Sequence, residues 1–293
     1  MLKRCILALS IVFIFTLLFF TMPLKAITGN QPAYLSAQSV IIVDCLTGAT
    51  LYAKDPDLLL PPASITKLMT SLLVADRVNL SDTVVVGKEI KGLEGASIGL
   101  LPGDRITAEN LMYALMMHSS NDAANALAAY ATGSIESFVA IMNTKSKEMG
   151  LISTNFVNPH GLPAPNHFSS ARDISVLARQ AMSNPIIQSI VNTKEREIYL
   201  QRGNGNRQRV KIQNTNKLLN LYPGVTGIKT GTSIEAGQCL VTYAEWDARK
   251  VVVVILNSAN RYLDSVYYLD RTYQELQLDR AGRLLLEKSL LSF

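Results

Sequence analysis

Two side chains three positions apart could form an activated nucleophile early in the chain. Ser64 and Lys67 lie in the segment Pro62-Ala63-Ser64-Ile65-Thr66-Lys67, which opens an apolar run with helical spacing. Residues three apart share one face of a helix, so the lysine amine can reach the serine hydroxyl. Burial favours the neutral form of a lysine, and a neutral amine can take the hydroxyl proton. On its own, however, this spacing more often marks a capped helix with a solvent-directed lysine.

Two further polar clusters interrupt apolar surroundings later in the chain. Ser119 and Asn121 follow an apolar helical stretch, and Lys229-Thr230-Gly231 lies in a predicted strand. A second lysine near the first would help to keep Lys67 uncharged, because like charges disfavour each other's ionised forms. Singly, Asn121 could be a helix cap and Lys-Thr-Gly the end of any edge strand. Together with the first pair they support nucleophilic chemistry only if folding brings all three clusters into one cleft.

The first 26 residues have the composition of a secretory signal. Lys3 and Arg4 precede an apolar stretch over residues 6–20, and Ala26 is a small residue suited to cleavage. As a helix this stretch would span about 22 Å, less than the roughly 30 Å hydrocarbon layer of a membrane. We therefore expect residues 1–26 to be removed and the mature protein to act outside the cytoplasm, with an uncleaved anchor as the alternative.

Charge and cysteine content exclude several classes of protein. The chain carries 28 lysines and arginines against 23 acidic residues, a formal charge of +5, and loss of the signal reduces it to +2. So small a basic excess does not favour nucleic acid as a partner. Only Cys45 and Cys239 remain beyond the signal, too few for a secreted disulfide scaffold. The three histidines lack paired ligand spacing, so no metal or other cofactor is expected.

Strands are predicted near both ends of the mature chain and helices between them. We expect strands over residues 39–43, 49–53, 84–86, 197–202, 207–213, 227–230, 238–245 and 250–257, and helices from Ser64 and over 111–117, 123–131, 135–149, 171–182 and 263–276. This order indicates an α+β fold in which one antiparallel sheet is closed by both termini beside a mostly helical lobe. No linker divides residues 27–276, which we predict to be one catalytic domain. Residues 277–293 form a short tail, expected to pack on the domain or, alternatively, to touch a membrane weakly.

The three polar clusters occur in the order Ser-x-x-Lys, Ser-x-Asn and Lys-Thr-Gly, which penicillin-binding proteins and serine β-lactamases share. From Ala37 to Leu276 the chain resembles the D-alanyl-D-alanine carboxypeptidases of peptidase family S11, which are low-molecular-mass penicillin-binding proteins. The flanking segments that also match are Asp44-Cys45-Leu46-Thr47-Gly48, Glu94-Gly95-Ala96-Ser97, Asn121-Asp122-Ala123-Ala124, Asn158-Pro159-His160-Gly161-Leu162, Ala171-Arg172-Asp173, Asn214-Thr215-Asn216 and Ala236-Gly237-Gln238-Cys239-Leu240. The resemblance implies a transpeptidase-like fold, with a five-stranded antiparallel sheet flanked by helices and a helical lobe that carries the Ser-x-Asn loop.

This resemblance implies a reaction and a role for each motif residue. Ser64 is expected to attack the carbonyl between the two terminal D-alanines of a peptidoglycan stem peptide, with Lys67 as its base and Ser119 relaying the proton to the leaving amine. The expected substrate-binding residues are Asn121, Lys229, Thr230, Gly231, Thr232 and Arg261. The backbone N–H groups of Ser64 and Thr232 would form the oxyanion hole. Peptides ending in D-Ala-D-Ala are the implied substrates and β-lactams the implied covalent inhibitors.

Two other functions share parts of this pattern. A class A β-lactamase adds a glutamate that activates the deacylating water, but residues 149–194 contain none. We therefore expect a penicillin acyl-enzyme to be hydrolysed slowly. A non-catalytic wall-binding module is the second alternative, although a pure binder has no need of perturbed lysines. His160, in an irregular loop, is expected to fix that loop through hydrogen bonds rather than to act as a base.

Two expectations concern side chains outside the site. In the family's strand order, the strands that bear Cys45 and Cys239 are separated by a third strand. Strands two apart lie roughly 9–10 Å from each other, beyond the reach of a disulfide, so both thiols are expected to be free. The arginines of the hairpin over residues 197–213 are expected to form a solvated face rather than a site for a polyanion.

Overall fold

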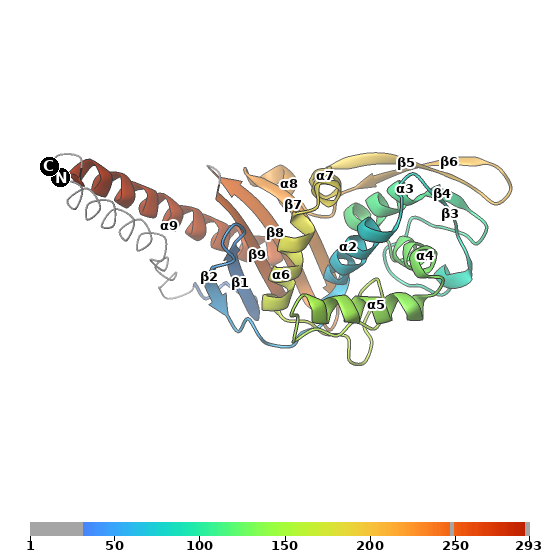
Figure 1. Cartoon of the computed structure of the whole chain (residues 1–293), viewed down its shortest axis with the longest axis horizontal. Coiled ribbons are helices and arrows are strands. Elements are labelled where there is room, and N and C mark those ends of the chain that lie inside the picture. Colours follow the sequence, from blue (N-terminus) through green and yellow to red (C-terminus); the bar gives the residue numbers. More distant parts are fainter. Residues whose placement is uncertain (1–31, 247–248, 291–293) are drawn as a thin grey trace, which may run out of the picture. The chain divides into compact units, whose positions relative to one another are not determined.

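The computed structural model describes residues 32–246 and 249–290, with side chains as far as Gln277 (Figure 1). The predicted signal, residues 1–26, lies outside the described residues. One compact unit spans Gln31–Asp270 and contains every candidate site residue, and the residues from Arg271 onward belong to a second unit. The fold given below is that of the first unit.

A five-stranded antiparallel sheet forms the centre of this unit, as predicted. Its strands are β1 (Ser39–Asp44), β2 (Thr50–Lys54), β7 (Val225–Ser233), β8 (Gly237–Trp246) and β9 (Arg249–Ser258). They lie in the order β2-β1-β9-β8-β7, with every neighbouring pair antiparallel. The first and last strands of the chain are therefore neighbours, which confirms that the two ends of the domain close the sheet.

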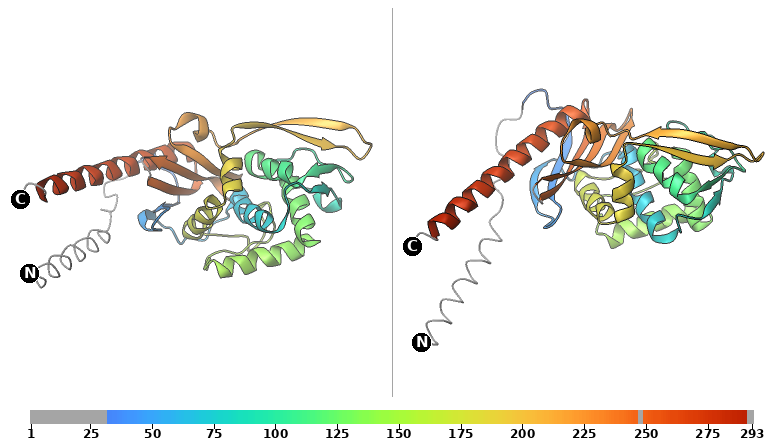
Figure 2. Two further views of the ribbon diagram at one scale, coloured as in Figure 1. Left: turned by 45° about the horizontal axis from the view of Figure 1, so that its top comes forward. Right: turned by 90° about the horizontal axis from the view of Figure 1, so that it is seen from above.

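Both faces of the sheet are buried, which explains why β9 is an almost unbroken run of valines. Successive side chains of a strand point to opposite faces. Val252, Val254 and Leu256 join the main hydrophobic core, while Val251, Val253 and Ile255 are buried on the other face. That second face is covered by the start of α9 (Arg261–Leu290) (Figure 2). The Tyr268 ring on this helix lies 5.0 Å from that of Tyr52 on β2.

Helices cover the first face and build the lobe beside it. They are η1 (Ala63–Thr66), α2 (Lys67–Arg77), η2 (Lys88–Ile90), α3 (Ala108–Tyr113), η3 (Ala114–His118), α4 (Asn121–Thr132), α5 (Ile135–Glu148), α6 (Ala171–Met182), α7 (Pro185–Asn192) and α8 (Leu218–Leu221). Helix α6 packs against β1 and β9, and η1 lies against β7. The buried residues of α2 extend without a break from Lys67 to Val74, so this helix runs through the interior. The turn that begins it is thereby held in place from all sides.

A second sheet, absent from the sequence prediction, borders the helical lobe. It has four strands in the order β3-β4-β5-β6, namely β3 (Thr83–Val85), β4 (Arg105–Thr107), β5 (Glu195–Gln201) and β6 (Arg207–Gln213). Strand β4 has three residues between a glycine turn and a helix cap, too few for an alternating pattern to be recognised. The predicted hairpin is confirmed as the β5–β6 pair, with Glu195 opposite Gln213.

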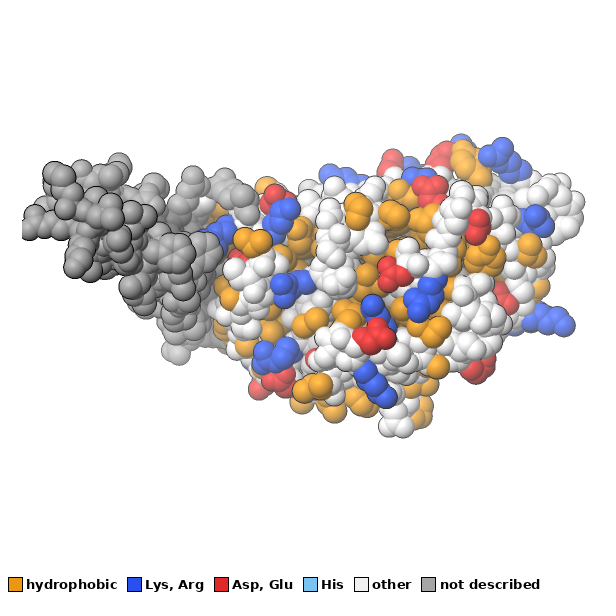
Figure 3. Space-filling view, viewed as in Figure 1, with side chains coloured by type: hydrophobic (Ala, Val, Ile, Leu, Met, Phe, Trp, Pro, Cys, Tyr) orange, Lys and Arg blue, Asp and Glu red, His pale blue; other side chains and the backbone are white. Residues whose placement is uncertain are grey.

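The basic hairpin is a solvated face with internal charge pairing, as expected. Arg209 pairs with Glu197 at 3.3 Å and Lys211 with Glu195 at 2.9 Å, and all four side chains are largely exposed. Basic and acidic side chains are likewise interspersed over the face of the molecule seen in Figure 3. Arg196 pairs with Glu109 and Arg202 with Asp104, so four of the five basic side chains of the hairpin have an acidic partner.

Two differences from the sequence prediction concern helices. Helix α7 was missed although Asn184 caps it and Pro185 is its first residue, a combination typical of a helix start. The last helix was predicted to end at Leu276, but α9 continues to Leu290 because no proline or capping glycine stops it at the predicted point. Among the described helices, none is both long enough and apolar enough to cross a bilayer.

The cysteines give a test of the strand order. Strand β9 separates β1, which Cys45 follows, from β8, which holds Cys239, and both thiols are free. Alkylation after denaturation without reductant should therefore modify both cysteines fully, whereas a disulfide-linked peptide pair would contradict this strand order. In the native protein the reaction should be slow, because burial raises the pKa of Cys239 to about 11 and that of Cys45 to about 12. Mass spectrometry of the digested protein measures the extent of alkylation at each cysteine.

Candidate active site

The candidate nucleophile lies on a short 3₁₀ turn rather than in the first turn of an α-helix. Pro61 and Pro62 lead into η1, in which Ala63 has the left-handed φ of 46° and Ser64 follows. The α-helix itself begins at Lys67. The predicted three-residue spacing survives this change, since side chains at i and i+3 also lie above one another in a 3₁₀ turn.

Lys67 is completely buried and has three close polar neighbours. Its Nζ lies 2.9 Å from Ser64 Oγ, 2.7 Å from Asn121 Oδ1 and 2.6 Å from the backbone oxygen of His160. The side chain is 0 % exposed. Three distant segments of the chain thus converge on one amine.

The chemistry of these neighbours matches a neutral lysine. The oxygens of Asn121 and His160 are carbonyls that can only accept, whereas the Ser64 hydroxyl can donate. A neutral amine has two N–H groups for the carbonyls and a lone pair left for the Ser64 proton. Burial is the main cause that lowers the pKa of Lys67 well below its usual value, and the charge of Lys229 lowers it further, against an opposing effect of Asp122.

Asn121 is oriented by the loop that precedes the helical lobe. Its Nδ2 donates to the backbone oxygen of Glu94 at 2.7 Å, which directs Oδ1 toward Lys67. Its backbone N–H donates to the oxygen of Ala96. The adjacent carboxylate of Asp122 is buried and accepts from Ser97 Oγ at 2.6 Å, so this loop is fastened on both sides. The sequence predicted Asn121 as a substrate-binding residue but did not single out Asp122.

Ser119 lies at the junction of η3 and α4, two residues before Asn121. It has a left-handed φ of 66° and is 8 % exposed. Within the described part of the chain, no hydrogen bond joins its hydroxyl to Lys67 or Lys229. The Ser119 hydroxyl is thus available to bond a ligand.

Strand β7 brings the third cluster against the nucleophile. A Cβ placed on Gly231 would lie 3.0 Å from the oxygen of Pro62 and 3.2 Å from the backbone nitrogen of Ser64, so a larger residue would require the strand or the turn to move by a few tenths of an ångström. Lys229 is 1 % exposed and donates to the oxygen of Thr230 at 3.1 Å. Burial, followed by the charge of Arg261, lowers the pKa of Lys229 to about 7.

Arg261, the first residue of α9, places its guanidinium against the Lys-Thr-Gly strand. Its guanidinium donates to the oxygen of Gly231 at 2.7 Å, to the oxygen of Cys239 at 3.0 Å and to Thr232 Oγ1. Thr230 is fixed from another direction, since its hydroxyl bonds that of Thr215 at 2.7 Å. Arg261 thus places a positive charge beside this strand, and the hydroxyls of Thr230 and Thr232 are both hydrogen-bonded.

The loop containing His160 supplies a contact that sequence reasoning missed. The backbone oxygen of His160 accepts from Lys67, and a backbone carbonyl has no signature in the identity of its residue. The expected role of the side chain is confirmed, since His160 Nδ1 accepts from the N–H of Leu162 and burial lowers the imidazole pKa to about 3. Gly161 packs so tightly that a Cβ there would lie 1.9 Å from the oxygen of Ala63.

In sequence and fold the chain is similar to D-alanyl-D-alanine carboxypeptidases. The family described as D-alanyl-D-alanine carboxypeptidase, peptidase S11, matches residues 26–260. The chain belongs to the peptidase S11 family. Among solved structures of similar fold is the Streptomyces K15 DD-transpeptidase, with a TM-score of 0.79 and 29% identity over 84% of this chain and all of that one. A D-alanyl-D-alanine carboxypeptidase from Mycobacterium tuberculosis has a TM-score of 0.77 and 30% identity, over 87% of this chain and 96% of that one.

Curated S11 relatives are longer than the segment they share with this chain. The carboxypeptidase DacF of Bacillus subtilis is 35% identical over 228 residues, which is 76% of this chain and 58% of the relative. DacC of Escherichia coli is 36% identical over 238 residues, which is 76% of this chain and 57% of the relative. The chain therefore spans less than three fifths of the length of these two relatives.

Substitution of Gly161 should test how the loop holds the nucleophile. Gly161→Ala places a methyl group against the oxygen of Ala63, so it should lower the free energy of unfolding and slow acylation of Ser64 by penicillin. A suitable control is Gly150→Ala, because Gly150 also has a positive φ but has open space at its Cβ position. Both variants should lose about 1–2 kcal/mol to backbone strain, and Gly161→Ala about 1–3 kcal/mol more to overpacking. Equal losses in denaturant unfolding and equal acylation rates would contradict this account.

Proposed function

We propose that the protein is a serine-type D-Ala-D-Ala carboxypeptidase that removes the terminal D-alanine from peptidoglycan stem peptides. The observation that carries the proposal is the buried Lys67 amine, which lies 2.9 Å from Ser64 Oγ. Its other two neighbours, Asn121 Oδ1 and the His160 backbone oxygen, can only accept hydrogen bonds. Such an amine can deprotonate the hydroxyl without first losing a proton to water. Membership of the S11 family supports the choice of substrate.

The proposed reaction has two stages. Ser64 Oγ attacks the carbonyl carbon between the two D-alanines as its proton passes to Lys67, and the C–N bond then breaks. Ser119 gives its proton to the departing amine and takes the proton held by Lys67 in its place, and free D-alanine leaves. Water then attacks the ester on Ser64, which releases the shortened peptide and restores the hydroxyl. The N–H groups of Ser64 and Thr232 stabilise the oxyanion in each stage, by about 2.7–4 kcal/mol per donor.

Strand β7 has the properties of a substrate-binding strand. It is at one edge of the five-stranded sheet, so its outer backbone groups can pair with an extended peptide. Lys229 and Arg261 provide positive charge beside Thr230 and Thr232, which suits the terminal carboxylate that distinguishes a carboxypeptidase substrate. Asn121 has its amide directed at Lys67 and can also meet the backbone of the substrate.

The setting of the proposed reaction follows from its substrate. Stem peptides are found in the cell wall, so the protein would act outside the cytoplasm after loss of residues 1–26. β-Lactams would acylate Ser64 and leave slowly, because residues 149–194 contain no glutamate to activate a water. No cofactor takes part in this chemistry.

Replacement of the nucleophile tests the proposal. Ser64→Ala should abolish both D-alanine release from a D-Ala-D-Ala pentapeptide and covalent labelling by penicillin. Ser71→Ala is the matched control, since Ser71 is a buried serine on α2 that bonds only the oxygen of Leu68. Scoring free D-alanine against cross-linked product separates a carboxypeptidase from a transpeptidase. Retention of both activities by Ser64→Ala would refute the proposal.

The pH dependence of acylation tests the role of the lysine pair. Only the neutral Lys67 amine accepts a proton, so acylation should rise with pH through the pKa of Lys67. Lys229→Met removes a charge that lowers this pKa, so the rising limb should move to higher pH, whatever the loss in overall rate. Lys91→Met, which changes an exposed lysine, should leave the limb in place. A limb that stays, or moves to lower pH, in Lys229→Met would contradict this role.

A further inference from the structure

Residues 155–168 form a loop that returns on itself beside η1, the nucleophile turn. Two backbone hydrogen bonds between Asn155 and Phe168, at 3.0 and 3.1 Å, join the two ends of the loop. The loop contains His160, whose backbone oxygen accepts from Lys67 Nζ. Because a loop supplies this contact, rather than a helix or a strand, its geometry depends on how the loop is held against the turn.

The two halves of the loop are held in different ways. Helix α2 holds the first half, since Thr70 Oγ1 donates to the oxygen of Pro159 at 2.6 Å. The second half, residues 162–168, has a single hydrogen bond to the nucleophile turn or to α2 among the residues that the structure describes. This bond joins His167 Nε2 to Thr66 Oγ1 at 2.9 Å. The second half therefore depends on one imidazole for its attachment.

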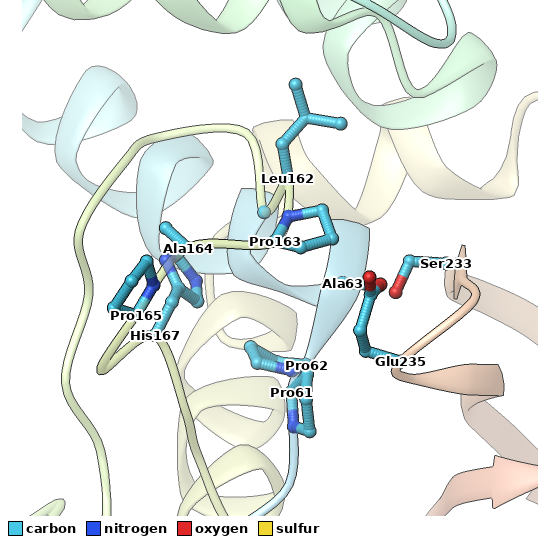
Figure 4. Close-up of a pocket in the computed structure, with 11 residues that line it drawn as sticks. Pro61, Pro62, Ala63, Leu162, Pro163, Ala164, Pro165, His167, Ser233 and Glu235 are labelled. Atoms are coloured by element: carbon cyan, nitrogen blue, oxygen red, sulfur yellow. The ribbon is translucent and has the colours of Figure 1, made fainter.

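The side chain of His167 lies close to Ala164 and Pro165 and has two hydrogen-bond partners (Figure 4). Its Nδ1 lies 3.2 Å from the backbone nitrogen of Val157, which can only donate, so Nδ1 accepts. The ring proton is therefore on Nε2, which donates to the Thr66 hydroxyl. Burial lowers the pKa of His167 to about 4, so the imidazole is neutral at neutral pH and keeps this tautomer.

Thr66 is well placed to pass the attachment on to the reacting groups. It follows Ser64 by two residues, directly precedes Lys67 and is 1 % exposed. A Cβ on Gly161 would lie 2.9 Å from Thr66 Oγ1, so the first half of the loop also packs against this hydroxyl. Both halves of the loop thus meet at one threonine of the nucleophile turn.

We propose that His167 is a positioning residue for acylation, and that its hydrogen bond to Thr66 holds the loop carbonyl against the Lys67 amine. His167 itself contacts neither the substrate nor the reacting atoms. Without its hydrogen bond the second half of the loop shifts, and Lys67 is less often in the geometry that accepts the Ser64 proton. The proposal rests on the use of Lys67 as the base in the proposed function and adds a residue outside the three motifs.

Two substitutions of His167 separate its contact with Thr66 from the rest of the side chain. His167→Gln keeps an N–H group near the position of Nε2, whereas His167→Asn keeps only an acceptor near that of Nδ1. Penicillin should acylate His167→Gln within about threefold of the unmodified rate and His167→Asn about tenfold more slowly, because misplaced reacting groups lose rate steeply. Thr66→Val removes the accepting hydroxyl with little change of shape and should also lose about tenfold. Acylation is followed well below the unfolding temperature of each variant.

The double variant Thr66→Val/His167→Asn shows whether the two residues act through each other. Residues in direct contact give non-additive losses, so the double variant should be about as slow as either single variant rather than about a hundredfold slower. Thr132→Val is the control, because it removes the two hydrogen bonds of a threonine at the end of α4 and should leave the acylation rate unchanged. A merely structural role of His167 would not produce rescue by glutamine without rescue by asparagine.

The outcomes separate this proposal from the function on which it rests. An unchanged rate in His167→Asn, equal losses in His167→Asn and His167→Gln, or additive losses in the double variant overturn the role of His167 and leave Ser64 as the nucleophile. If His167→Asn does not fold, an unchanged rate in Thr66→Val overturns it instead. An unmodified protein that neither releases D-alanine nor is labelled by penicillin removes both proposals.

Discussion

The exclusion of water from one lysine amine is the constraint on which the rest of the site depends. An ammonium group in this position would have to lose most of its hydration, and the two carbonyls that it meets do not offset that cost. The neutral amine is satisfied by the same neighbours and retains a lone pair directed at Ser64. The 3₁₀ turn, the amide of Asn121, the loop at His160 and strand β7 all serve to keep this small volume dry.

The charged groups around the Lys67 amine shift its pKa in opposite directions. Asp122 raises the pKa of Lys67, while the charge of Lys229 lowers it, so the acid that fastens the loop partly opposes the second lysine. Lys229 has a pKa of about 7 and so remains partly charged near neutral pH. The two buried lysines can thus have different protonation states in a single cleft. One is suited to accept a proton and the other to hold an anion.

Side-chain patterns predicted the motif residues of the candidate site better than the segments that hold them in position. The three-residue spacing of Ser64 and Lys67, the strand through Lys-Thr-Gly and one antiparallel sheet follow from residue types and periods, whereas the number of five strands was implied by the resemblance to peptidase family S11. The contact from His160 could not be found in this way, because it is made by a backbone carbonyl. Strand β4 is too short to show a period, and it is a strand only because β3 and β5 flank it.

The strand that completes the sheet is the last to be synthesised. Ser39 on β1 pairs with Leu256 on β9, 217 residues later, and β8 and β7 attach to β1 only through β9. Contacts between such distant segments form slowly, since a large loop must close before they are made. A nascent polypeptide therefore carries Ser64 and Lys67 for most of its length before β9 has been made. Until then no set of paired strands joins β7 to β1, and the Lys-Thr-Gly segment has no sheet to hold it beside the nucleophile turn.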